Sequence, residues 1–143
     1  MSIYADTSFL VSLYLPDAHT LEAQRRITQP QPLWFSPLHH AEATHAILQQ
    51  VFRGSITTRE AQQILKQLEQ DLSSNLWEYT DVPDGVFETC IQLARKHAAR
   101  LGVRTLDTLH VASAPELKAK DFWTFDERKS KLAPAEGLKL LKP

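Results

Sequence analysis

Residues 3–14 read IYADTSFLVSLY, and this stretch decides the fold class that the sequence predicts. Ile3–Ala5 is a short apolar run typical of a buried strand, and Asp6 ends it. Thr7 or Ser8 can act as the N-cap of the helix that follows, because a hydroxyl oxygen accepts a hydrogen bond from the free N–H groups of a helix start. A strand that leads directly into a helix is the first half of a parallel strand–helix–strand unit.

The same alternation continues along the chain. Further strands are predicted at 33–35, 76–80, 122–125 and near 138–141, and helices at 21–28, 36–54, 57–72, 83–102 and 105–114, with a short helix before the last strand. Pro30 and Pro32 are expected to close the helix at 21–28, and Pro115 to bend or end the helix at 105–114. This order favours an α/β fold with a central, mostly parallel sheet of about four to five strands flanked by helices.

Three of the predicted helices carry apolar side chains at helical spacing, and we expect these stripes to face the core. The stripes are Leu38, Ala41, His45, Leu48 and Phe52; Ala61, Ile64, Leu65, Leu68 and Leu72; and Phe87, Ile91, Ala94, Ala98 and Leu101. Cys90 lies among the residues of the third stripe, which favours core packing over redox chemistry.

The composition is that of one globular domain, which we expect to span residues 1–143. The chain is 43% hydrophobic and 23% charged, with a formal net charge of −1, which excludes global disorder and a broadly basic nucleic-acid-binding surface. A single cysteine fits a reducing compartment. The N-terminus lacks the basic region of a signal peptide, and no apolar run approaches the roughly 18 residues of a membrane span. We therefore expect a cytoplasmic protein.

Four carboxylates are candidates for one site. Asp6 and Asp126 each follow a predicted strand, and the carboxyl ends of parallel strands meet at one edge of a sheet, where ligands bind. Glu42 lies early in the helix at 36–54, and Asp107 lies in the first turn of the helix at 105–114. Each acid alone has an ordinary explanation as a turn residue, a solvated flank or a helix-dipole partner. The prediction rests on their convergence.

Convergent carboxylates repel one another, and a divalent cation removes that repulsion. Ligands that are all oxygen suit Mg²⁺ or Mn²⁺ rather than Zn²⁺. Such an ion lowers the pKa of bound water and neutralises charge on a phosphate, so phosphodiester hydrolysis is the chemistry that this pattern favours.

Taken together, four short motifs resemble those of the PIN domain, and of the VapC-type toxin ribonucleases of bacterial toxin–antitoxin pairs in particular. The motifs are Tyr4-Ala5-Asp6-Thr7-Ser8, Ala41-Glu42, Leu106-Asp107 with His110, and Thr124-Phe125-Asp126, in an order that covers nearly the whole chain. Lys118 is a departure, because similar sequences frequently have glycine there.

The resemblance implies an endoribonuclease that cuts RNA with Mg²⁺ or Mn²⁺. It implies that Asp6 and Asp107 are the principal metal ligands and that Glu42 and Asp126 complete the catalytic acids, directly or through water. Ser8 matches a small polar residue that supports the first acid, and Thr124 is a candidate for a similar supporting role. The partners implied are a cognate antitoxin protein and a second copy of the chain.

Basic residues precede Asp107 in a short run, at Arg95, Lys96, Arg100 and Arg104. They are candidate phosphate contacts, and Arg104 is favoured because it lies three residues from Asp107. An ordinary solvated helix face remains the alternative.

Other readings of these residues remain open. Glu42 with His45 and Asp107 with His110 have the carboxylate–histidine spacing of di-iron sites, but those sites need a four-helix bundle, and the predicted strands argue against one. The sequence has no P-loop or dinucleotide-binding glycine pattern. The alternative function is a catalytically inactive PIN-like module that binds RNA or protein without cutting.

Overall fold

The computed structural model describes residues 3–27 and 33–140, which form two compact units. The first unit holds the chain up to Asp6 and from Val82 onward, and the second holds Thr7–Asp81. Each unit contains its own parallel strands. Thr28, Pro30, Pro32 and Leu141, on which some expectations fall, lie outside the described residues. No helix of the described residues is long and apolar enough to cross a membrane.

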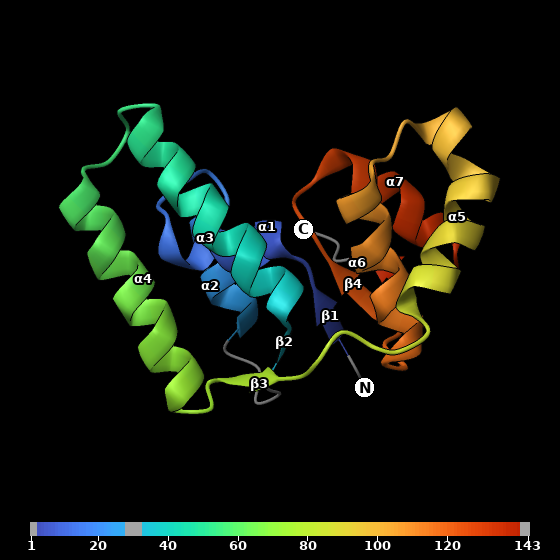
Figure 1. The fold of residues 1–143 in the computed structure, drawn as a ribbon, viewed down its shortest axis with the longest axis horizontal. Helices are drawn as coiled ribbons and strands as arrows, with labels where there is room; N and C mark the ends of the chain where they lie inside the picture. The colour runs from blue at the N-terminus through green and yellow to red at the C-terminus, as the bar shows by residue number, and fades with distance from the viewer. Residues whose placement is uncertain (1–2, 28–32, 141–143) are drawn as a thin grey trace. The chain divides into compact units, whose positions relative to one another are not determined.

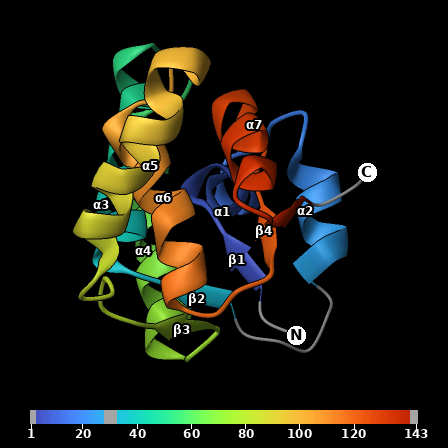
Figure 2. The same ribbon diagram turned by 90° about the vertical axis from the view of Figure 1, so that its right-hand side faces the viewer.

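The first unit is built on three parallel strands, β1 (Ile3–Ala5), β4 (Asp121–Trp123) and β5 (Lys139–Leu140), in the order β1-β4-β5. Three helices accompany them: α5 (Val86–Leu101), α6 (Thr105–Glu116) and α7 (Glu127–Ala135). Figure 2 shows β1 beside β4, with α7 following the end of β4.

The core of the first unit lies around the β1–β4 pair. The rings of Tyr4 and Phe122 stack at a centroid distance of 5.4 Å, and both side chains are buried. Val111 of α6 and Leu132 of α7 are fully buried. Every residue from Asp107 to Ala114 is buried, so α6 has no solvent-facing side over most of its length.

The second unit holds two parallel strands, β2 (Leu33–Phe35) and β3 (Trp77–Tyr79). Its helices are α1 (Thr7–Tyr14), α2 (Thr20–Ile27), α3 (Pro37–Phe52) and α4 (Thr58–Ser73). Helices α3 and α4 run side by side as an antiparallel hairpin (Figure 1). Capping boxes start both helices, at Ser36 and at Thr57, which are the positions where the predicted helices 36–54 and 57–72 begin.

The predicted α/β class and the parallel direction of the strands are confirmed, but two sheets were not foreseen. The fourth strand was predicted to run through Phe125, whereas β4 ends at Trp123. The reason is its partner: Ala5, the last residue of β1, pairs with Trp123, and one further backbone bond from Asp6 N to the carbonyl of Trp123 closes the ladder. The helix expected to open at Pro83 begins instead at Val86.

Helix α6 ends beyond the predicted position, because Pro115 lies inside it. Helix α6 continues through Pro115 to Glu116, and the backbone N–H of Leu117 still bonds the carbonyl of Ser113. Lys118, which follows that helix end, has a left-handed backbone with a φ of 61°. Glycine adopts this conformation without steric cost, which explains physically why glycine suits this position.

Two predicted core stripes are wrong: the α5 stripe is displaced by one residue, and in α3 none of the predicted stripe residues is among the buried ones. In α3 the buried residues are His39, Ala43 and Ile47, while Phe52 is 89% exposed. In α5 the buried set is Val86, Cys90, Leu93 and His97, while Phe87 and Ile91 are exposed. Each observed buried stripe contains a histidine, His39 in α3 and His97 in α5. A search for apolar residues at helical spacing does not identify a buried histidine. The α4 stripe is confirmed, with Ala61 and Leu68 buried.

Candidate functional site

Three of the four predicted acids lie together in the first unit. Asp6 follows β1, Asp107 lies in the first turn of α6, and Asp126 is the N-cap of α7. The Nζ atom of Lys129, on α7, lies 3.1 Å from Oδ2 of Asp6, 3.6 Å from Oδ1 of Asp107 and 4.0 Å from Oδ2 of Asp126. We call these four residues the acidic site.

Asp6 is fully buried at the end of β1. Its backbone N–H bonds the carbonyl of Trp123, so the sheet ladder fixes the position of its main chain. Its Oδ2 atom accepts a 2.5 Å hydrogen bond from the hydroxyl of Thr124 and also faces the Lys129 ammonium. The carboxylate is therefore held from two sides.

Thr124 connects two of the acids. Its hydroxyl oxygen donates to Asp6 and accepts a 2.9 Å hydrogen bond from the backbone N–H of Asp126. The Oδ2 atom of Asp126 in turn accepts from the backbone N–H of Lys129 at 3.0 Å, the N-cap bond that starts α7. One short loop after β4 thus supplies an acid, the hydroxyl that orients another acid, and a helix start.

Asp107 is buried and belongs to the start of α6. Its Oδ2 atom accepts a 3.0 Å hydrogen bond from the backbone N–H of Arg104, and its Oδ1 atom faces Lys129. The Nε atom of Arg104 lies 3.8 Å from Oδ2 of Asp107, and the Arg104 side chain is 71% exposed. An exposed guanidinium beside a buried carboxylate can contact an anion brought to the site.

Lys129 is the residue of this site that sequence reasoning missed. Its side chain is only 7% exposed. Burial by itself lowers the pKa of Lys129, but the charges of Asp6 and Asp126, the hydrogen bond to Asp6 and the charge of Asp107 outweigh it, so the pKa is raised. A lysine three residues after the N-cap acid Asp126 was the available signal, since that spacing places both on one helix face.

The fourth acid, Glu42, belongs to the second unit. There its Oε1 atom accepts a 2.8 Å hydrogen bond from the hydroxyl of Thr7, the first residue of α1. Ser8 is in the same unit, and its carbonyl accepts from the hydroxyl of Ser12 one turn later. Thr7 was considered only as a helix cap in the sequence, and its bond to Glu42 was not foreseen.

His110 is a packed core residue. It is fully buried, and its Nδ1 atom lies 2.7 Å from the hydroxyl of Tyr4, with the two rings edge to face. His45, by contrast, lies on the exposed side of α3. The di-iron interpretation is unsupported, because it needs a four-helix bundle and these residues belong to units built on parallel strands.

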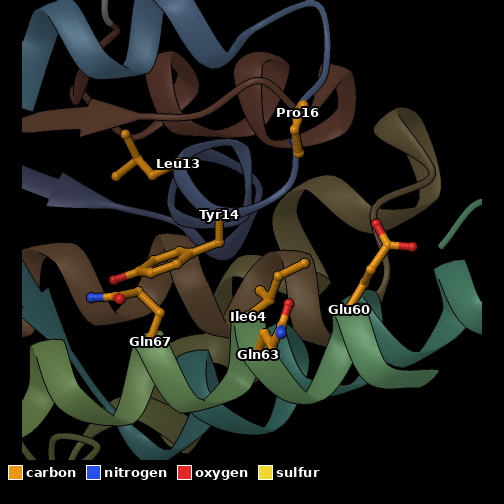
Figure 3. A pocket seen from close by; sticks show the side chains of 7 residues that line it. All are labelled: Leu13, Tyr14, Pro16, Glu60, Gln63, Ile64 and Gln67. Atoms are coloured by element: carbon orange, nitrogen blue, oxygen red, sulfur yellow. The ribbon is translucent and has the colours of Figure 1, made fainter. Parts of the chain in front are cut away.

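A shallow groove of about 420 Å³ lies in the second unit, between the end of α1 and α4 (Figure 3). Its lining residues are Leu13, Tyr14, Pro16, Glu60, Gln63, Ile64 and Gln67. Three of the polar side chains that line it have structural roles: Tyr14 and Gln67 both bond Asp71, and Glu60 caps α4. The groove offers no arrangement for catalysis.

The oxygen donors of the acidic site are of the kind that binds a divalent cation, but in this structure they are not arranged around a position for one. Carboxylate oxygens are the ligands that Mg²⁺ and Mn²⁺ prefer. However, within residues 3–27 and 33–140 no group of three or more His, Cys, Asp or Glu is arranged to hold a metal ion. The Lys129 ammonium occupies the space that the three carboxylates share.

Comparison with known proteins places this geometry in a family. Residues 3–134 match the PIN domain. Ribonuclease VapC3 from Pyrobaculum aerophilum is 27% identical over 136 residues, which cover 94% of this chain and 97% of that protein.

Solved structures share the fold at lower identity. VapC20 of Mycobacterium tuberculosis, a sarcin-ricin loop cleaving toxin, has a TM-score of 0.71 at 21% identity, over 99% of this chain and 100% of that one. VapBC2 from Rickettsia felis, solved with a DNA fragment from its promoter, has a TM-score of 0.68 at 18% identity, over 99% and 98% of the two chains. The match to the PIN domain covers residues 3–134, which is most of this chain, so the chain belongs to the PIN domain family.

Proposed function

We propose that this protein is a metal-dependent endoribonuclease that hydrolyses RNA phosphodiester bonds, and that it is the toxin of a toxin–antitoxin pair. The observation that carries the proposal is the meeting of Asp6, Asp107 and Asp126 at the ends of three elements of a PIN domain. The relation to Ribonuclease VapC3 supports RNA as the substrate class. We treat residues 1–143 as one functional domain acting in the cytoplasm.

The acids have distinct roles in this proposal. Asp6 and Asp107 are the principal ligands of Mg²⁺ or Mn²⁺, and Asp126 and Glu42 complete the set of acids, directly or through water. A bound ion would supply an activated water and neutralise charge on the scissile phosphate. Thr124 orients the Asp6 carboxylate through its hydrogen bond. Ser8 supports the chain beside the first acid.

Substrate contact is assigned to Arg104. Its guanidinium is largely exposed and lies at the edge of the acidic site, beside Asp107. A planar guanidinium binds phosphate oxygens in pairs, which would position the RNA backbone without reading its bases.

The proposed partners are an antitoxin protein and a second copy of this chain. Support for the antitoxin comes from solved structures of the same fold, which include VapBC2 from Rickettsia felis and FitAB bound to a DNA fragment. Co-expression with the protein encoded beside it, followed by size-exclusion chromatography, tests both.

A second candidate function is a PIN-like module that binds RNA or protein without cutting. The position of Lys129 favours it, because an ammonium group already balances part of the charge of the acids.

Cleavage of end-labelled RNA by the purified protein separates the two functions. A nuclease cuts with Mg²⁺ or Mn²⁺ and not with EDTA, leaving 5′-phosphate and 3′-hydroxyl ends. Retained RNA binding in EDTA with no cleavage under either ion would favour the binding module.

A further inference from the structure

We propose that Lys129 regulates metal binding: its ammonium group serves as a built-in counter-ion of the acidic site and competes with the divalent cation for the three carboxylates. This inference rests on the proposed function, because it assumes that the acidic site takes a metal ion.

The geometry of Lys129 is that of a counter-ion rather than of a surface lysine. Its Nζ atom lies within 4.0 Å of an oxygen of each carboxylate, and the side chain is 7% exposed. No other lysine or arginine among the described residues is both buried and in contact with all three acids.

A metal ion and the ammonium cannot share this space without cost. Carboxylate oxygens bind Mg²⁺ at about 2.0–2.1 Å, so an ion held by Asp6 and Asp107 would lie a few ångström from Nζ. Two positive charges at that separation repel, and the repulsion is screened little in a buried site. The flexible four-carbon stem of Lys129 allows the ammonium to move away, whereas the acids are fixed by the sheet and by helix starts.

The competition has a consequence for the resting protein. Without a divalent ion, Lys129 relieves the mutual repulsion of the acids and keeps the site assembled. With the ion, the same lysine lowers affinity, so half-saturation of the site needs a higher metal concentration than it would without Lys129.

Lys131 provides a matched control on the same helix. It is a lysine of α7 with its Nζ atom 3.6 Å from Glu127, and its side chain is 58% exposed. Replacing Lys131 removes one positive charge from α7 without touching the acidic site.

The test is a calorimetric titration of Mn²⁺ into the full-length protein, in the wild type and in the Lys129→Gln, Lys129→Met and Lys131→Gln variants. Unfolding in EDTA is measured alongside. We expect Mn²⁺ to bind both Lys129 variants about tenfold more tightly than the wild type, since one repelling charge is removed, and Lys131→Gln to bind as the wild type does. We also expect the melting temperature of the Lys129 variants to fall in EDTA and to recover with Mn²⁺. The methionine variant keeps the apolar stem and serves if the glutamine variant does not fold.

Three results would overturn the inference. Equal or weaker Mn²⁺ binding in both folded Lys129 variants, with measurable binding in the wild type, removes the competition and leaves the metal site intact. The same gain in Mn²⁺ affinity in Lys131→Gln would mean that removing any positive charge from α7 strengthens metal binding, whether or not the lysine contacts the acidic site. Absence of Mn²⁺ binding in every variant removes the proposed metal site together with the competition.

Discussion

The hydroxyl of Thr124 lies 2.5 Å from Oδ2 of Asp6, although 118 positions separate the two residues in sequence. The parallel pairing of β1 with β4 makes this contact, because Ala5 and Trp123 are partners and each is the last residue of its strand, so Asp6 and Thr124 follow at the same edge. The geometry of the acidic site thus depends on the register of one strand pair.

Thr124→Val removes the hydroxyl that orients Asp6 and accepts from the backbone of Asp126. We expect RNA cleavage to fall about 10–100-fold, the usual cost of losing a group that orients a metal ligand. Thr124→Ser keeps the hydroxyl and should retain most activity. The rate is measured on labelled RNA with Mn²⁺, and full activity of the valine variant would contradict this role.

Lys118→Gly should stabilise the protein. The left-handed backbone of Lys118 carries a steric cost of about 1 kcal/mol that glycine avoids, partly offset by the greater entropy of glycine in the unfolded chain. We expect a gain of about 0.5 kcal/mol and a melting temperature about 1–2 °C higher by calorimetry. Lys120→Gly, at an exposed neighbouring position without a positive φ, should bring no gain.

Cys90 should react slowly in the folded protein. The thiol is buried, and burial raises its pKa, so little of the reactive thiolate is present near neutral pH. We expect a disulfide reagent at pH 8 to modify the native protein at least about tenfold more slowly than the urea-unfolded chain. Equal rates would mean that the α5 stripe containing Cys90 is not packed as described.

Tyr14→Phe should destabilise the second unit. The Tyr14 hydroxyl donates to Asp71 at 2.6 Å and accepts from Nε1 of the buried Trp77 at 2.8 Å. Its loss leaves the indole N–H without this acceptor, so we expect a cost of about 1–3 kcal/mol in urea unfolding at pH 7. Tyr79→Phe, at an exposed tyrosine of β3, is the control and should cost little.

Tyr14 also makes the free energy of unfolding depend on pH in the alkaline range. Burial, with the hydrogen bond to Asp71, raises the pKa of Tyr14 above that of a tyrosine in the unfolded chain. The unfolded chain therefore loses this proton first, so the stabilisation is complete below pH of about 10 and declines as the pH rises further. Urea unfolding between neutral and alkaline pH should show a smaller decline for Tyr14→Phe than for the wild type, and equal declines would contradict the assignment.

The parts of the fold that local signals determine were predictable. The starts of α3 and α4 were predicted at 36 and 57, and both helices have their N-caps there, at Ser36 before Pro37 and at Thr57 of the Thr57–Glu60 capping box. Asp6 and Asp126 were singled out because each follows a strand, and this rule needs no knowledge of which strands pair.

The parts that depend on long-range contacts were not predictable. The sequence cannot say that β1 pairs with β4 while β2 pairs with β3, so the two sheets emerged only in the structure. His39 and His97 are buried through hydrogen bonds to Ser36 and Glu136, which a hydrophobic pattern does not register. Lys129 was missed because a lysine is ordinarily a surface residue, and only the convergence of three acids makes its burial favourable.

The most direct test of the central claim is RNA cleavage by Asp107→Asn beside the wild type and Asp84→Asn, with Mn²⁺ and with EDTA. Asp84 is an exposed acid of the first unit and is not one of the residues of the acidic site. The account predicts metal-dependent cleavage by the wild type and by Asp84→Asn, and a loss of at least about 100-fold in Asp107→Asn with its melting curve still cooperative. Undiminished cleavage by a folded Asp107→Asn protein would contradict it.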